Sequence, residues 1–151
     1  MRRTATPPKR AKQDKPALEP EDFRVHLIEK AEEIAPRDVA EVLERAAEVR
    51  AKASRPAVDR RLRRRLEVAL ELLRDHVTDE CPQIPLHTVA VLAVAVLYFL
   101  NPLDAIPDDL GRIGTVDDAL VLELAFEAAR AGIQRYCDFK DHSTEGLFRI
   151  E

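Results

Sequence analysis

Tryptophan is absent from the 151-residue chain, aromatic residues make up only 5% of it, and it has four glycines. Alternating runs of polar and apolar residues that would predict β-strands are also missing. These shortages argue against a sandwich or barrel, which needs many short strands and frequent turns. The sequence instead contains long stretches of Ala, Leu, Glu and Arg, which are strong helix formers. We therefore expect an all-α protein with an aliphatic core.

Cysteine is equally scarce. Cys81 and Cys137 are the only two, and their separation matches no zinc-binding pattern. The start of the chain has no apolar signal-peptide core, so isolated thiols without an export signal predict a cytoplasmic location. No P-loop, GxGxxG motif or nucleophile-elbow serine occurs, which leaves nucleotide binding and serine catalysis without support. Whether the protein is an enzyme stays open, with the balance towards a non-enzymatic role.

The length favours one compact domain with tails. We expect a disordered basic tail over 1–18, an amphipathic helical pair over 19–56, a main helical domain over 57–140 and a C-terminal tail over 141–151. In that tail Leu147, Phe148 and Ile150 are able to dock on the core. Apolar residues at helical spacing predict helices over about 20–34, 36–53, 58–78, 86–100 and 116–139. In the third of these, the predicted buried stripe consists of Leu62, Leu66, Ala69, Leu70, Leu73 and Val77.

The segment 86–100, LHTVAVLAVAVLYFL, is apolar on every side. A helix of this kind is either the centre of a bundle or a membrane span. Counted from residue 84, the apolar run has 17 residues, which is at the lower limit for crossing a bilayer. The amphipathic neighbours favour a central core helix, because their stripes need a surface to cover. A single-pass span over 84–100, anchored in the inner membrane, remains the alternative.

Charge is distributed unevenly along the chain, although the net charge is only −4. Residues 1–18 contain six basic side chains, and residues 60–65 contain five arginines: Arg60, Arg61, Arg63, Arg64 and Arg65. Cations at a helix N-terminus oppose the helix dipole, so this cluster does not serve the helix itself. It points to an anionic partner, either a protein or an anionic membrane surface rather than nucleic acid, with a solvated face as the simpler interpretation.

An acidic junction separates the two most hydrophobic segments. The stretch 98–108, YFLNPLDAIPD, is followed by Gly114 and by VDDALVL over 116–122. This pattern resembles the signature of the YkvA-like family, which covers about residues 60–130 here. The resemblance implies a small helical domain of unknown function and implies no reaction. Many members of that family look membrane-associated, so the resemblance keeps open the alternative that this otherwise cytoplasmic protein is associated with or anchored in the inner membrane.

Two interpretations of the junction stay open. Its acids Asp104, Asp108, Asp117 and Asp118 would supply the carboxylate oxygens that Mg²⁺ or Ca²⁺ prefers, if the loop brings them together. Helix capping and turn chemistry explain most of the same acids without a ligand. The sequence therefore predicts first a helical interaction or adaptor module at an anionic surface. A divalent-metal protein, with or without enzymatic activity, and a single-pass membrane protein are the alternatives.

Overall fold

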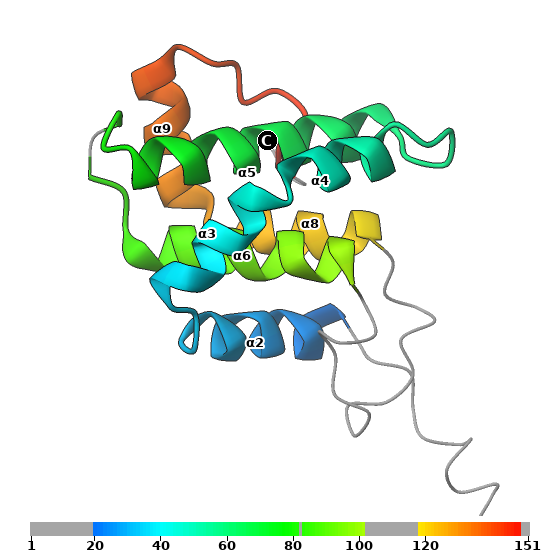
Figure 1. Cartoon of the computed structure of the whole chain (residues 1–151), viewed down its shortest axis with the longest axis horizontal. Coiled ribbons are helices and arrows are strands. Elements are labelled where there is room, and N and C mark those ends of the chain that lie inside the picture. The colour runs from blue at the N-terminus through cyan, green and yellow to red at the C-terminus, as the bar shows by residue number, and fades with distance from the viewer. Residues whose placement is uncertain (1–19, 82, 102–117, 149–151) are drawn as a thin grey trace, which may run out of the picture.

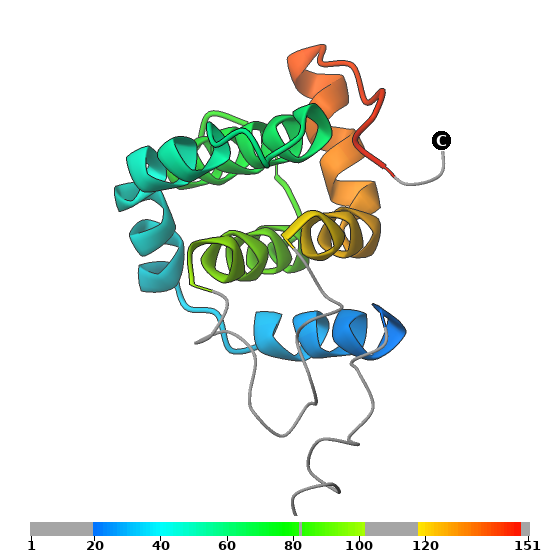
Figure 2. The ribbon, with the colours of Figure 1, turned by 90° about the vertical axis from the view of Figure 1, so that its right-hand side faces the viewer.

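The computed structural model describes residues 20–81, 83–101 and 118–148, and these segments contain helices joined by turns. The helices there are α2 (Pro20–Ala31), α3 (Pro36–Glu44), α4 (Ala46–Ala53), α5 (Arg60–Val77), α6 (Leu86–Leu100), α8 (Asp118–Ala128) and α9 (Arg130–Lys140). They form three layers (Figures 1 and 2): α4 with α5, then α6 beside α8, then α2. Helices α3 and α9 run across the layers on opposite sides (Figure 2). The expected class, an all-α compact bundle, is confirmed.

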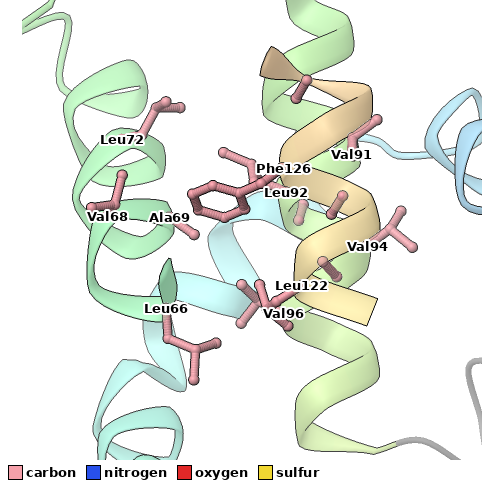
Figure 3. Packing of buried hydrophobic residues seen from close by; sticks show 14 of the residues in the cluster. Leu66, Val68, Ala69, Leu72, Val91, Leu92, Val94, Val96, Leu122 and Phe126 are labelled. Carbon is pink, nitrogen blue, oxygen red and sulfur yellow. The ribbon is translucent and has the colours of Figure 1, made fainter. Parts of the chain in front are cut away.

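Helix α6 is the centre of the bundle. It packs against all six of the other described helices, and 10 of its 15 residues are buried. Figure 3 shows the Phe126 ring reaching from α8 towards Ala69 of α5, which closes the core beside α6. Each buried Val or Leu contributes about 1.5–3 kcal/mol of transfer free energy, so α6 contributes a large part of the core. The expected central helix is confirmed.

The predicted helix over 36–53 is in fact two helices. Arg45 leaves helical geometry with φ −101° and ψ 16°, yet its N–H still bonds to the carbonyl groups of Glu41 and Val42. The break is therefore a bend rather than a gap. It allows α3 and α4 to pack on both α5 and α6. No Pro or Gly marks this position, so tertiary packing decides it.

The predicted helix over 116–139 also bends, at Ala129, where φ is −108° and ψ is 19°. Beyond the bend α9 turns out of the middle layer towards α5 (Figures 1 and 2). Close approach of α9 to α6 requires Gly132, because a Cβ there would overlap Thr88 Oγ1 and lie 2.8 Å from Thr88 Cβ. The glycine thus sets how near the two helices can come.

Helix α5 begins after Asp59, whose side chain caps it by accepting a hydrogen bond of 2.8 Å from Leu62 N. Its predicted buried stripe is correct except at Val77, which is 55% exposed. That residue is the last of the helix. The predicted helix over 20–34 likewise ends earlier, at Ala31.

The C-terminal segment packs against the helices over residues 141–148 and is not a loose tail there. Leu147 and Phe148 are both buried, with exposed fractions of 0% and 2%. The Phe148 ring lies 6.3 Å from the Phe126 ring, and the Arg130 guanidinium lies 4.4 Å from its centroid. Residues 141–148 therefore form part of the packed structure.

Candidate functional site

The acidic junction lies between the end of α6 and the start of α8. Asp118, the first residue of α8, is the one acid of the predicted metal set that falls within the described residues. Asp104, Asp108 and Asp117 lie outside them, so the predicted convergence of the four carboxylates stays a prediction. Over 20–81, 83–101 and 118–148, no group of three His, Cys, Asp or Glu side chains is arranged to hold a metal ion.

Lys52 of α4 connects the two helix ends that flank the junction. Its ammonium group donates a hydrogen bond to the carbonyl of Phe99, near the end of α6, and lies 4.7 Å from the Phe99 ring centroid. The same nitrogen lies 3.9 Å from Asp118 Oδ2. A cation at the C-terminal end of a helix satisfies a carbonyl that has no partner within the helix and interacts favourably with the dipole. Lys52, which is far from the motif in sequence, therefore places a positive charge between the end of α6 and the start of α8. The sequence did not indicate this contact.

The arginine cluster at residues 60–65 is divided by the fold. Arg65 is only 1% exposed, so it presents no surface to a partner, and its assignment as a contact residue is corrected. Its Nε donates a hydrogen bond of 2.8 Å to the Leu147 carbonyl, and its Nη1 lies 4.0 Å from Glu123 Oε2. Burial lowers the pKa of the guanidinium, and Glu123 opposes that effect. Arg65 lies three residues after Leu62 and therefore falls on the buried stripe, a signal that the sequence did contain.

Two more arginines of the cluster bind the chain's own carbonyl groups. Arg63 donates to the Ala53 carbonyl at 3.0 Å and to the Val58 carbonyl at 2.7 Å. These bonds hold the loop between α4 and α5 against the start of α5. Arg64 donates to the Ser143 carbonyl at 2.9 Å and so fixes the C-terminal segment.

The two remaining arginines of the cluster, together with Arg55 of the preceding loop, have exposed side chains. Arg55, Arg60 and Arg61 are exposed, and their guanidinium groups make no hydrogen bond or ion pair within the described part of the chain. We call these three residues the arginine tip. The loop that carries Arg55 and the start of α5, which carries Arg60 and Arg61, lie at one end of the molecule, on the right of Figure 1. Arg55 was missed in the sequence because it lies outside the run at 60–65.

A buried polar network joins α5 to α9 and was not expected from the sequence. The Asp75 carboxylate has no exposed surface, and its Oδ2 accepts a hydrogen bond of 2.6 Å from the Tyr136 hydroxyl. Lys140 Nζ lies 3.1 Å from the same oxygen, and Arg74 donates to Oδ1 at 3.2 Å. Burial alone would raise the pKa of Asp75, but the three donors outweigh it and lower the pKa. Burial and the bond to Asp75 raise the pKa of Tyr136 far above its ordinary value.

The fold and its junction define a helical domain with no recognisable catalytic constellation among the described residues. Residues 88–124 match the family model described as "Protein of unknown function (DUF1232)". The chain is 35% identical over 66 residues to the "Uncharacterized membrane protein YkvA" of Bacillus subtilis (strain 168). That match covers 44% of this chain and 62% of the relative. The resemblance to the YkvA-like family is confirmed by these two matches. No solved structure matches the chain.

Helix α6 also bears on the predicted membrane span over 84–100. It has 15 residues and is covered by the other helices of the bundle. None of the helices in the described segments combines the length and the apolar character needed to cross a membrane. The span alternative thus gains no support from the fold.

Proposed function

We propose that the protein is a non-enzymatic helical interaction module that docks on the anionic cytoplasmic face of a membrane through the arginine tip. The observation that carries this proposal is that Arg55, Arg60 and Arg61 are exposed and have no internal partner in the described segments. Their neighbours Asp59 and Arg63 hold the loop in place by hydrogen bonds. Guanidinium groups on a backbone that is held in place lose less freedom when they bind than those on a loose one.

The chemistry of the tip suits phosphate groups. Arg60 and Arg61 occupy the first turn of α5, where the helix dipole disfavours cations. Their placement therefore weakens the helix slightly, and in this proposal the two side chains bind lipid phosphate groups instead. A guanidinium group offers paired N–H donors that match the oxygens of a phosphate, which every anionic phospholipid carries.

Two further observations favour a membrane over an acidic protein. Helix α2 begins on the same side of the molecule as the tip, the right of Figure 1, and the sequence before it contains six basic side chains over residues 1–18. The relative from Bacillus subtilis carries the name of a membrane protein. Each Lys or Arg close to an anionic bilayer contributes about 1 kcal/mol, so the tip gives weak, reversible binding that residues 1–18 strengthen.

The test is co-sedimentation of the full chain with vesicles of phosphatidylcholine alone and of phosphatidylcholine mixed with phosphatidylglycerol. We expect binding to the mixed vesicles only. The double variant Arg60→Gln/Arg61→Gln should bind at least about tenfold more weakly, because two contributions of about 1 kcal/mol are lost. Arg37→Gln/Arg135→Gln removes the same charge from two exposed arginines of α3 and α9 and is the matched control.

Several results would overturn the proposal. Equal losses in the tip variant and in the control would show that only net charge matters. Binding to pure phosphatidylcholine would show that the arginines are not the contact. Absence of binding to mixed vesicles at low salt would leave an acidic protein surface as the partner of the tip.

A further inference from the structure

The end of the molecule opposite the arginine tip carries an apolar groove. The end of α2, the start of α3, the end of α5 and the start of α6 all lie on the left of Figure 1. Between them is a groove of about 630 Å³, and most of its lining is apolar: Ala31, Ile34, Val39, Val77, Leu86 and Val89. A half-open apolar cleft of this volume falls within the range of ligand sites in proteins.

Two side chains of the groove are unusually exposed. Val77, at the end of α5, is 55% exposed, and Leu86, at the start of α6, is 73% exposed. Large aliphatic side chains left in water at the edge of a groove are typical of a surface that another molecule covers.

The charges around the groove identify its occupant. Glu32 lines one side of it, and an adjoining hollow that shares His76 and Leu86 is lined by Asp79. Neither carboxylate has an ion pair or side-chain hydrogen bond within the described part of the chain. Among the described residues, Arg135 is the arginine or lysine that lines these two hollows, and it lines the second one together with Asp79. The groove therefore offers the Glu32 carboxylate to cations, and the hollow beside it offers the Asp79 carboxylate.

We infer that this groove docks an amphipathic helix of a partner protein, with its apolar face on Val77 and Leu86 and its Lys or Arg side chains beside Glu32 and Asp79. Laying one apolar helix face into a groove is a common mode of peptide recognition. A second copy of this chain fits less well, because a symmetric pair brings the same patch, and so the same carboxylates, against itself. The inference goes beyond the membrane proposal and requires different residues.

The probe is a fluorescent amphipathic Leu/Lys peptide of about four helical turns, with a Leu/Glu peptide of the same pattern as comparison. We expect the full chain to bind the Leu/Lys peptide and not the Leu/Glu peptide in anisotropy titrations. Val77→Ser/Leu86→Ser should weaken binding at least about tenfold, since it removes the apolar anchors. Val25→Ser changes an aliphatic residue that is 48% exposed on α2 outside the groove, and it should change the affinity less than about twofold.

The carboxylates are tested with Glu32→Gln/Asp79→Asn. Asparagine suits position 79, where φ is +61°. We expect several-fold weaker binding, whereas Glu44→Gln/Glu145→Gln, the matched change at exposed carboxylates elsewhere, leaves binding unchanged. Equal effects of the two pairs, equal binding of the Leu/Glu peptide, or indifference to Val77→Ser/Leu86→Ser would each overturn the inference. So would a concentration-dependent dimer that Leu86→Ser abolishes, because the occupant would then be a second copy.

Discussion

Asp75 is a carboxylate with no exposed surface that receives donors from Tyr136, Lys140 and Arg74. Two of these come from α9, so the network fixes α9 against the end of α5. A buried carboxylate is tolerated only when its oxygens are bonded, because desolvation of an unpaired charge costs several kcal/mol. Every described contact of Asp75 is internal, which makes this network structural rather than a site for a ligand.

The network predicts an acid-sensitive stability. The donors lower the pKa of Asp75 below its ordinary value of 3.8, so the folded state binds this proton more weakly than the unfolded state. The stabilisation is therefore present above about pH 4 and lost as the pH falls through the folded pKa. Asp75→Asn should lower the free energy of unfolding by about 2–3 kcal/mol at pH 7 and flatten its dependence on pH below 4.

Urea unfolding between pH 3 and pH 7 measures both effects. Asp79→Asn, an exposed acid on the following turn, is the control and should retain the wild-type slope. Parallel pH profiles of Asp75→Asn and the wild type would show that the network does not stabilise the folded state through its charge.

Lys52 makes a different kind of prediction at the same scale. Lys52→Met keeps most of the aliphatic stem but removes the ammonium group from the Phe99 carbonyl and from Asp118. We expect the free energy of unfolding to fall by about 1 kcal/mol and the melting temperature by about 2–4 °C. Lys30→Met, which removes a more exposed ammonium group paired with Glu33 at 3.7 Å, should have a smaller effect.

The same variant tests the metal alternative for the acidic junction. An ammonium group 3.9 Å from Asp118 repels a divalent cation at that carboxylate. If the four aspartates bind Mg²⁺ or Ca²⁺, Lys52→Met should bind it more tightly, and its melting temperature should rise more than that of the wild type. Under our proposal, millimolar Mg²⁺ or Ca²⁺ shifts neither protein.

At the scale of the elements, the bends at Arg45 and Ala129 allow short helices to follow the surface of α6. Both bends keep hydrogen bonds across them, from Arg45 N to Glu41 O and from Ala129 N to Ala125 O. Neither contains a residue that breaks helices, so only the shape of the bundle explains their positions. The bend at Ala129 directs α9 across the start of α6, where Gly132 meets Thr88.

The contact between α6 and α9 predicts a strong effect of a small change. Gly132→Ala should lower the free energy of unfolding by about 1–3 kcal/mol, although alanine favours helices, because the new methyl group overlaps Thr88. Thr88→Ala removes Oγ1 and should recover part of the loss in the double variant. Urea unfolding of the two single variants and the double variant measures the coupling, and strictly additive effects would contradict the close contact.

At the scale of the whole molecule, the hydrophobic pattern predicted the central helix and the fold class correctly, because a helix that is apolar on every side is buried only at the centre of a bundle. Helical spacing also places Arg65, three residues after Leu62, on the buried stripe of α5. The sequence could not predict which side chains far apart along the chain contact one another in the fold. Asp75 and Tyr136 are 61 positions apart, and Lys52 meets Asp118 only because α4 folds back on α6.

The two proposed surfaces lie at opposite ends of α5, and this separation leads to a final prediction. The helix has 18 residues and is about 27 Å long, roughly three times the Debye length of about 8 Å at physiological salt. A change of charge at one end of α5 should therefore not alter the electrostatic potential at the other end. Arg60→Gln/Arg61→Gln should leave peptide affinity unchanged, and Val77→Ser/Leu86→Ser should leave vesicle binding unchanged.

Vesicles carrying the wild-type protein should also retain more of the Leu/Lys peptide than bare vesicles retain, because an adaptor binds both ligands at once. If the two ligands exclude one another on the wild-type protein, a single surface must serve both.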